Sequence, residues 1–152
     1  MNAGSLTLVE VRPRVRGRFW RVFAPSEEFL APWWDEELRV DDVDHWFSAR
    51  RDGVEVARCK FILEPGPLDR KPLGPMPHGQ LDILALEVAV SARRQGIGLA
   101  TVQAIRAMYP LPRMTALNDD ATSRRFWDGI GWVRHELDPF FAGVERVTYS
   151  EV

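Results

Sequence analysis

Two glycines separated by one residue follow an apolar run and open a segment with helical spacing of its apolar residues. They are Gly96 and Gly98, and Arg93 and Arg94 come just before them. The first turn of a helix has backbone N–H groups without intrahelical acceptors, and the aligned peptide dipoles add partial positive charge there. Glycine lets a bulky anion come close to the backbone. The pattern therefore predicts a cradle for phosphate or pyrophosphate, with the two arginines adding charge at its edge.

Two better-known phosphate-binding motifs do not fit this segment. No Gly-Lys-Ser/Thr follows the glycines, which excludes a P-loop. The third glycine of the dinucleotide-binding fingerprint is missing as well. A bare Gly-x-Gly also occurs in tight strand-to-helix turns that bind nothing, so the spacing alone leaves both interpretations open.

The run Arg93-x-x-Gly96-x-Gly98 resembles the Arg/Gln-x-x-Gly-x-Gly/Ala signature of the GNAT N-acetyltransferase superfamily. Residues 120–132 resemble the later Asn-x-x-Ala-x-x-Phe-Tyr-x-x-x-Gly-Phe block of the same family. The resemblance covers roughly residues 81–133, whereas residues 1–45 match only in general layout. It implies one α/β domain over residues 1–152, with a twisted, mixed, mostly antiparallel sheet, splayed central strands and flanking helices.

The resemblance also implies a co-substrate, acetyl-CoA, whose acetyl group passes to an amine by direct attack in a ternary complex. The backbone of Leu86 and Val88 would pair with the pantetheine arm, and the Val88 amide would polarise the thioester carbonyl. Amides from Gln95 to Ala100 would hold the pyrophosphate, and the Asn118 carboxamide would touch the pantetheine chain. The expected cofactor-binding residues are Leu86, Val88, Ala89, Val90, Arg93, Arg94, Gln95, Gly96, Ile97, Gly98, Leu99, Ala100, Asn118 and Trp127.

Asp82 is the expected general base, and Val88 and Asp82 together are the expected catalytic residues. Asp82 lies on the predicted central strand, where some members of the family carry a glutamate that acts through water. Strand alternation would put it on the same face as Leu86 and Val88 unless a bulge intervenes. Partial burial would give the carboxylate the raised pKa that a base needs. A solvent-facing Asp82 is the alternative, and Glu87 and His78 are weaker candidates.

Trp127 departs from the family pattern, because the family often has a tyrosine there that protonates the leaving thiolate. An indole cannot do this at neutral pH, so the thiolate must leave unassisted, take a proton from water or use another donor. Trp127 would then pack against the cofactor or the core. The departure also leaves open a CoA-binding regulatory module with weak or lost catalysis.

Composition narrows the remaining possibilities. Cys59 is the only cysteine, which excludes an intramolecular disulfide and a multi-thiolate zinc site, and the three histidines have no metal-ligand spacing. We therefore expect no metal site. We also expect a cytoplasmic protein without a membrane partner, because no apolar run has the length of a membrane span. A homodimer is compatible with the sequence. The net charge of -2 argues against a surface built for nucleic acid. Arginines on every second residue from Arg12 to Arg18 keep an RNA-directed acylating modifier open as an alternative.

Acids and tryptophans gather before the glycine motif, where the family has its acceptor-side segments. The tryptophans are Trp20, Trp33, Trp34 and Trp46, and six acids lie between Asp35 and Asp44. In one interpretation this is an ordinary solvated face beside core tryptophans. In the other it attracts a small-molecule or peptide amine, with cationic or aromatic acceptors preferred.

Periodicity and turn signals place these residues on elements. An Asp52-Gly53 pair between two β-rich runs is a strong hairpin signal, and Gly131 is placed to end a helix. Residues 64–79 hold five prolines and three glycines, which predicts a surface loop. Strands are expected at 6–11, 46–50, 54–63, 81–90, 114–117, 132–137 and 146–149, and helices at 26–30, 96–108 and 120–129.

Overall fold

The computed structural model describes residues 5–12, 14–16, 19–31, 43–118, 121–135 and 147–152. The chain divides into two compact units that are interleaved in sequence. The first consists of Met1–Phe61 and Ala85–Met108, and the second of Ile62–Leu84 and Tyr109–Val152. One domain over residues 1–152 stays a prediction, and each unit is described by itself.

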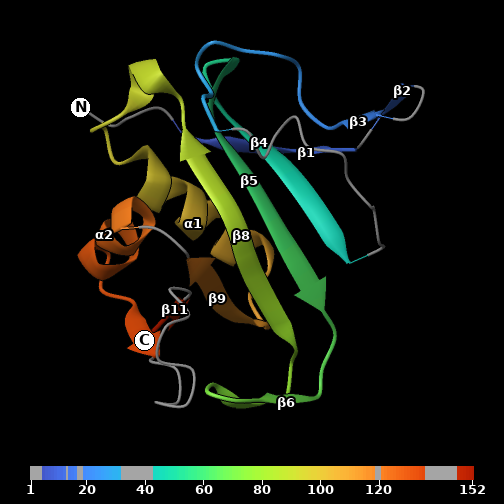
Figure 1. Cartoon of the computed structure of the whole chain (residues 1–152), viewed down its shortest axis with the longest axis vertical. Helices are drawn as coiled ribbons and strands as arrows, with labels where there is room; N and C mark the ends of the chain where they lie inside the picture. Colours follow the sequence, from blue (N-terminus) through green and yellow to red (C-terminus); the bar gives the residue numbers. More distant parts are fainter. Residues whose placement is uncertain (1–4, 13, 17–18, 32–42, 119–120, 136–146) are drawn as a thin grey trace. The chain divides into compact units, whose positions relative to one another are not determined.

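A long hairpin dominates the first unit. Strand β1 (Thr7–Val11) pairs antiparallel with β4 (Asp44–Arg51), and β4 is followed by β5 (Val54–Glu64), whose residues up to Phe61 belong to this unit (Figure 1). Asp52 and Gly53 have φ angles of 52° and 78°. Two consecutive positive φ angles are what a type I′ turn requires, so the predicted hairpin is confirmed.

A short ribbon precedes this hairpin. Strands β2 (Arg14–Arg16) and β3 (Phe19–Arg21) pair antiparallel, with Arg14 directly opposite Arg21. The alternating arginines of the sequence thus fall partly on paired strands.

The end of the central strand and a helix complete the first unit. Strand β8 (Gln80–Val88) enters the unit at Ala85, a 3₁₀ turn η2 (Val90–Ala92) follows, and helix α1 (Ile97–Met108) comes next. The predicted helix is confirmed. Its buried residues are Ile97, Gly98, Thr101, Val102 and Ile105.

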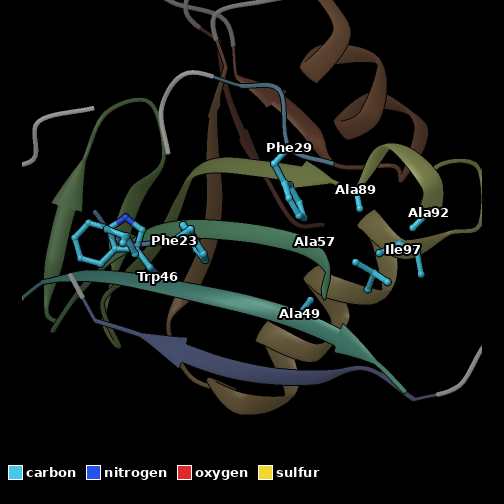
Figure 2. Close-up of a cluster of buried hydrophobic side chains, with 10 residues drawn as sticks. Phe23, Phe29, Trp46, Ala49, Ala57, Ala89, Ala92 and Ile97 are labelled. Carbon is cyan, nitrogen blue, oxygen red and sulfur yellow. The ribbon is translucent and has the colours of Figure 1, made fainter. Parts of the chain in front are cut away.

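The core of the first unit joins β1, β4, β5, the end of β8, η2 and the start of α1. Figure 2 shows Ala89, Ala92 and Ile97 gathered where the strand end, η2 and the start of α1 meet. Trp46, from β4, is 2% exposed and belongs to the same cluster. Cys59, from β5, is 1% exposed, and burial raises the pKa of its thiol.

The prediction of a helix at residues 26–30 is wrong, because the chain there forms a turn. Ser26 accepts hydrogen bonds from the N–H groups of Glu28 (3.2 Å, to the side-chain Oγ) and Phe29 (3.3 Å, to the carbonyl). The next two N–H groups, of Leu30 and Ala31, donate to the distant carboxylate of Glu87 instead of to helical carbonyls. Forming a single helical turn is unfavourable in free energy, so one well-placed acceptor is enough to draw these N–H groups away from helical hydrogen bonds.

A buried arginine fastens the same segment to β5. Arg58 is 4% exposed, and its guanidinium carbon lies 4.7 Å from the ring centre of Phe23 and 4.1 Å from that of Phe29. Its Nη2 donates to the Ala24 carbonyl at 2.8 Å, and its Nε donates to Glu55 Oε1 at 3.0 Å. The charge is thus paired, hydrogen-bonded and sandwiched by aromatic faces, as a buried guanidinium must be.

The second unit contains the parallel part of the sheet. Residues Gln80–Ile83 of β8 pair with residues 113–116 of β9 (Arg113–Asn118) in parallel. Strand β11 (Val147–Ser150) pairs antiparallel with β9, and β10 (Val133–His135) pairs antiparallel with β11. The expected mixed, mostly antiparallel sheet is therefore confirmed.

The loop predicted at residues 64–79 carries a small hairpin, so that expectation was wrong in part. Strands β6 (Leu68–Arg70) and β7 (Gly74–Met76) pair antiparallel (Figure 1). The ends of the loop touch at two glycines. A Cβ added at Gly66 would lie 2.3 Å from the Pro77 carbonyl oxygen, and one at Gly79 would lie 2.1 Å from that of Glu64.

Helix α2 (Ala121–Gly129) ends as the sequence predicts. Gly131 has a φ of 83°, and its N–H donates to the Asp128 carbonyl at 3.1 Å. Trp132 N–H donates to the Trp127 carbonyl at 3.1 Å, which completes a glycine-based helix end. The predicted cap, Asp120, lies outside the described residues. No helix in the described part of the chain is long and apolar enough to cross a membrane.

Candidate cofactor and active site

Helix α1 begins with backbone donors that its own carbonyls cannot satisfy. The Gly96 carbonyl accepts the first helical hydrogen bond, from Ala100 N–H at 3.0 Å, so Gly96 is the N-cap residue. Glycine offers no capping oxygen, and the first turn holds no acidic side chain. The N–H groups of Ile97, Gly98 and Leu99 therefore have no acceptor within the helix. They and the helix dipole make a place for an anion.

Backbone geometry keeps this place open. Gly96 has a φ of 73°, and a Cβ built on it would meet no atom within 4 Å among the described residues. Arg94 also has a positive φ, 64°, which is rare for a residue with a side chain. Arg93, Arg94 and Gln95 are all exposed. The residues present thus fit a bulky phosphate group beside Gly96.

Arg93, at the edge of the cradle, folds back on the strand end. Its Nε lies 3.4 Å from the Val88 carbonyl oxygen, and its Nη2 lies 3.9 Å from Glu87 Oε2. The side chain is 50% exposed, so the guanidinium still faces solvent. This arrangement supplies positive charge next to the cradle.

Arg51 is a neighbour of the cradle that sequence reasoning missed. Its Nη2 donates to Gln95 Oε1 at 2.8 Å, and Gln95 Nε2 donates to the Ser91 carbonyl at 3.4 Å. Arg51 ends β4, 44 residues before its partner. The only available signal was the Asp52-Gly53 turn, which fixes where the hairpin tip lies but not what it touches.

The strand end uses some of its expected donors within the protein. Ala89 N–H donates to the Val56 carbonyl at 2.8 Å, and Val90 N–H donates to the Glu28 carbonyl at 3.0 Å. Successive N–H groups of a strand point to opposite edges, so the Val88 N–H points away from β5. Of these three expected cofactor contacts, Ala89 and Val90 thus already donate their N–H groups to carbonyls of the protein.

Two glutamates tie the segment at residues 26–31 to this strand end. Glu28 Oε2 accepts Ser91 N–H at 2.8 Å. Glu87 is 9% exposed and accepts the N–H groups of Leu30 (2.9 Å) and Ala31 (3.2 Å) on Oε2. Glu87 therefore holds the backbone of Leu30 and Ala31 in place, which argues against a role as the general base. Glu28 was missed because its partner Ser91 lies 63 residues away.

Asp82 lies in the second unit and is half-buried. Thr115 Oγ1 donates to Asp82 Oδ1 at 2.8 Å. Burial raises the pKa of Asp82, while the Thr115 hydrogen bond and the charge of Arg70 act to lower it by less. A carboxylate in this setting holds a proton at higher pH than an exposed one does.

Two other expected contacts are Trp127 and Asn118. Trp127 is 3% exposed, and its ring centre lies 4.8 Å from that of Phe126 and 4.5 Å from that of Trp132. Asn118 ends β9, where its backbone is opposite Val147. Cofactor contacts of Trp127 and Asn118 remain predictions.

The acceptor-side expectation falls largely on residues 32–42, which lie outside the described residues. Of the described members, Asp44 is 7% exposed, and Trp46 belongs to the core with Lys60 Nζ 5.3 Å from its ring centre. For Trp46 the core interpretation holds, whereas the buried Asp44 does not lie on the solvated face that this interpretation expected for the acids. Among the described residues, no three of His, Cys, Asp and Glu come together in a way that could hold a metal ion.

No family model matches the sequence, and no curated protein matches it. Solved structures do resemble it. An acetyltransferase from Thermus thermophilus superposes with a TM-score of 0.56 at 16% identity, over 74% of this chain and 66% of the other, just under two thirds of that protein's length. The Bacillus subtilis N-acetyltransferase YlbP, in complex with coenzyme A, gives 0.50 at 16% identity over 70% of each chain.

A third similar structure covers almost the whole chain. It is a mutant of the toxin AtaT bound to the C-terminus of the antitoxin AtaR, with a TM-score of 0.58 at 12% identity over 96% of this chain and 92% of the other. At such low identities these similarities establish a shared fold.

Proposed function

We propose that this chain, which has the fold of the GNAT acetyltransferases, binds acetyl-CoA and transfers its acetyl group to an amine. The observation that carries the proposal is the glycine at the start of α1. Gly96 leaves open space where other N-cap residues carry a side chain, and arginines flank it. A pyrophosphate matches these donors by charge.

The pantetheine arm would lie along the edge of β8 that faces away from β5, beside Leu86 and Val88. The Val88 N–H, directed to that edge, donates to the thioester oxygen. This donor stabilises the negative charge that develops on the oxygen as the amine nitrogen attacks the carbonyl carbon. The carbon–nitrogen bond forms, the carbon–sulfur bond breaks, and the amine loses one proton.

Asp82 takes that proton, directly or through one water molecule, in this proposal. Its half-buried position supports the role, because burial raises the pKa of a carboxylate toward the working range of a base. The proton on the leaving sulfur comes from water. Trp127 offers no acid, and the buried Tyr149 hydroxyl already donates to Asp128 Oδ1 at 2.9 Å.

A binding experiment tests the cofactor site, and a turnover experiment tests the enzyme. Acetyl-CoA at a hundredfold excess over its Kd should raise the free energy of unfolding by about 2.7 kcal/mol. A panel of amines should then release thiol from acetyl-CoA. A thermal melt unmoved by millimolar acetyl-CoA contradicts the cofactor site. Stabilisation without thiol release for any amine would instead favour a regulatory module that binds CoA without turnover.

The acceptor is expected to be a small cationic or aromatic amine, on the strength of the acids and tryptophans between residues 33 and 44. Carboxylates steer cations toward a site, and aromatic faces add about 0.5 to 2 kcal/mol of attraction. The test compares kcat/KM for matched cationic, neutral and acidic amines at low and high salt. Equal rates, or a best acceptor with net negative charge, would contradict this preference and leave the cofactor site untouched.

An RNA-linked acceptor is the second candidate, favoured by the β2–β3 ribbon. Its register sets Arg14 opposite Arg21, and Arg16 lies on the same short strand as Arg14. Arginines are the residues that bind the phosphate backbone of RNA, so an arginine-rich ribbon is where RNA would bind. RNA retention that falls steeply with salt, and falls again in an Arg14→Gln/Arg21→Gln variant, would support this candidate. Retention that is absent at low salt contradicts it.

A further inference from the structure

A directed chain of hydrogen bonds in the second unit ends on Asp82. Arg70 Nη1 donates to Gln80 Oε1 at 2.9 Å, and Gln80 Nε2 donates to Thr115 Oγ1 at 2.9 Å. Thr115 Oγ1 then donates to Asp82 Oδ1 at 2.8 Å. The two middle members are buried, with Gln80 6% and Thr115 0% exposed. Three strands, β6, β8 and β9, thus contribute to one polar path.

With Asp82 ionised, the chemistry of the four groups allows only one direction for this path. A guanidinium donates and cannot accept, so Gln80 must turn its carbonyl oxygen toward Arg70. The amide nitrogen of Gln80 then faces Thr115, whose oxygen becomes an acceptor. The single hydroxyl hydrogen of Thr115 is left for Asp82. Each donor points toward the carboxylate, and bonds aligned in this way strengthen one another.

A second carboxylate balances the far end of the path. Glu64 Oε1 lies 3.0 Å from Arg70 Nη1, and Glu64 Oε2 lies 2.6 Å from Arg70 Nη2. The positive charge of Arg70 acts to lower the pKa of Asp82, and the negative charge of Glu64 acts to raise it. The two charged partners of this path therefore pull the Asp82 carboxyl in opposite directions.

We propose that Arg70 is a positioning residue for Asp82: through Gln80 and Thr115 it fixes Oδ1 and leaves Oδ2 for the proton of the acceptor amine. Glu64 moderates this effect by neutralising Arg70. The inference rests on the proposed role of Asp82 as the base. It adds that the small β6–β7 hairpin, which holds none of the residues expected at the site, supplies the residue that orients that base.

The test measures the titration of the Asp82 carboxyl by carbon-13 NMR, with the Asp82→Asn variant identifying the signal. Arg70→Met keeps the length of the side chain and removes its charge, so the midpoint should move up. Glu64→Gln keeps the shape of Glu64 and leaves Arg70 unbalanced, so the midpoint should move down. Midpoints that stay fixed, or that move in the same direction, overturn the proposal.

A matched pair at Thr115 separates positioning from folding. Thr115→Ser keeps the hydroxyl and should keep both the midpoint and kcat/KM near those of the parent. Thr115→Val keeps the shape, removes the donor, and should raise the midpoint and lower kcat/KM by about tenfold to a hundredfold. Equal behaviour of Ser and Val variants with parental melting temperatures contradicts the path.

The two levels of the proposal fail in distinguishable ways. If Asp82→Asn keeps full activity, Asp82 is not the base and its positioning has no catalytic meaning. If the enzyme requires Asp82 but the Arg70 and Glu64 variants leave its pH–rate profile in place, the base stands and the positioning role of Arg70 falls. Opposite shifts in both the NMR midpoint and the pH–rate profile support both levels.

Discussion

At the scale of single residues, the candidate site depends on the absence of a side chain at Gly96. Gly96 combines a φ of 73° with the N-cap position of α1 and with open space where a side chain would be. Any capping side chain there would take the donors that a phosphate needs. A residue that caps the helix and a residue that admits the cofactor are therefore alternatives at this position.

Gly96→Asp should abolish stabilisation by acetyl-CoA and leave the apo fold intact. Aspartate tolerates positive φ better than most residues, and its carboxylate would cap the helix and repel phosphate. Gly96→Asn is the matched control, since it has the same shape without the charge, and it should retain more binding. The measurement is the thermal shift with acetyl-CoA for both variants. Parental binding by both would mean that the cradle is elsewhere.

Asp82→Asn should lower kcat/KM by about a hundredfold or more if Asp82 is the base, because an amide cannot take a proton. The rise of kcat/KM with pH should weaken in the same variant, since burial raises the pKa of Asp82 in the parent. The measurement is kcat/KM against pH with saturating acetyl-CoA. A parental profile would remove Asp82 from the mechanism.

At the scale of elements, sequence pattern predicted what is local and missed what is long-range. The Asp52-Gly53 hairpin and α1 follow from turn chemistry and from a helical period, which neighbouring residues determine. The turn at residues 26–31 was missed because Glu87, 56 and 57 residues away, accepts its N–H groups. The glycine motif was likewise readable from sequence, whereas Arg51 and the path to Asp82 depend on how strands pair.

Gly79→Ala tests the element that brings Arg70 beside Gln80. A Cβ at Gly79 would meet the Glu64 carbonyl oxygen at 2.1 Å, on a residue whose φ is already 88°. Gly74→Ala is the control: its φ is 79°, but no described atom lies within 4 Å of the added Cβ. The control should lose about 1 to 2 kcal/mol of stability from strain alone. Gly79→Ala should lose clearly more in denaturant melts, and equal losses would contradict the close approach.

At the scale of the whole molecule, a half-buried carboxylate is a stability cost that the proposed function explains. The pKa of Asp82 is higher in the folded chain than in the unfolded chain, where it is about 3.9. The folded state therefore binds the proton more tightly, and stability falls as pH rises from the unfolded pKa to the folded one. Above both values, the full cost of the buried charge is present.

The same substitution that removes the base should thus stabilise the fold. Asp82→Asn is expected to melt at a higher temperature than the parent at pH 7, and the Asn oxygen still accepts from Thr115. The gap should close as pH falls below about 4, where the parent is protonated too. Melting temperatures across pH check this, and a variant less stable than the parent at pH 7 contradicts it.

The solitary thiol of Cys59 gives the molecule a built-in reporter. Because the thiol is 1% exposed and burial raises its pKa, a thiol-reactive dye has almost nothing to attack in the native state. In a turnover assay the dye therefore counts released CoA without a background from the protein. In the absence of turnover, dye uptake requires opening of the unit that also carries the cradle. Acetyl-CoA, whose sulfur is acylated and does not react with the dye, should slow the reaction of the dye with Cys59, and tighter binding should slow it more. The same dye therefore measures both turnover and the affinity for acetyl-CoA.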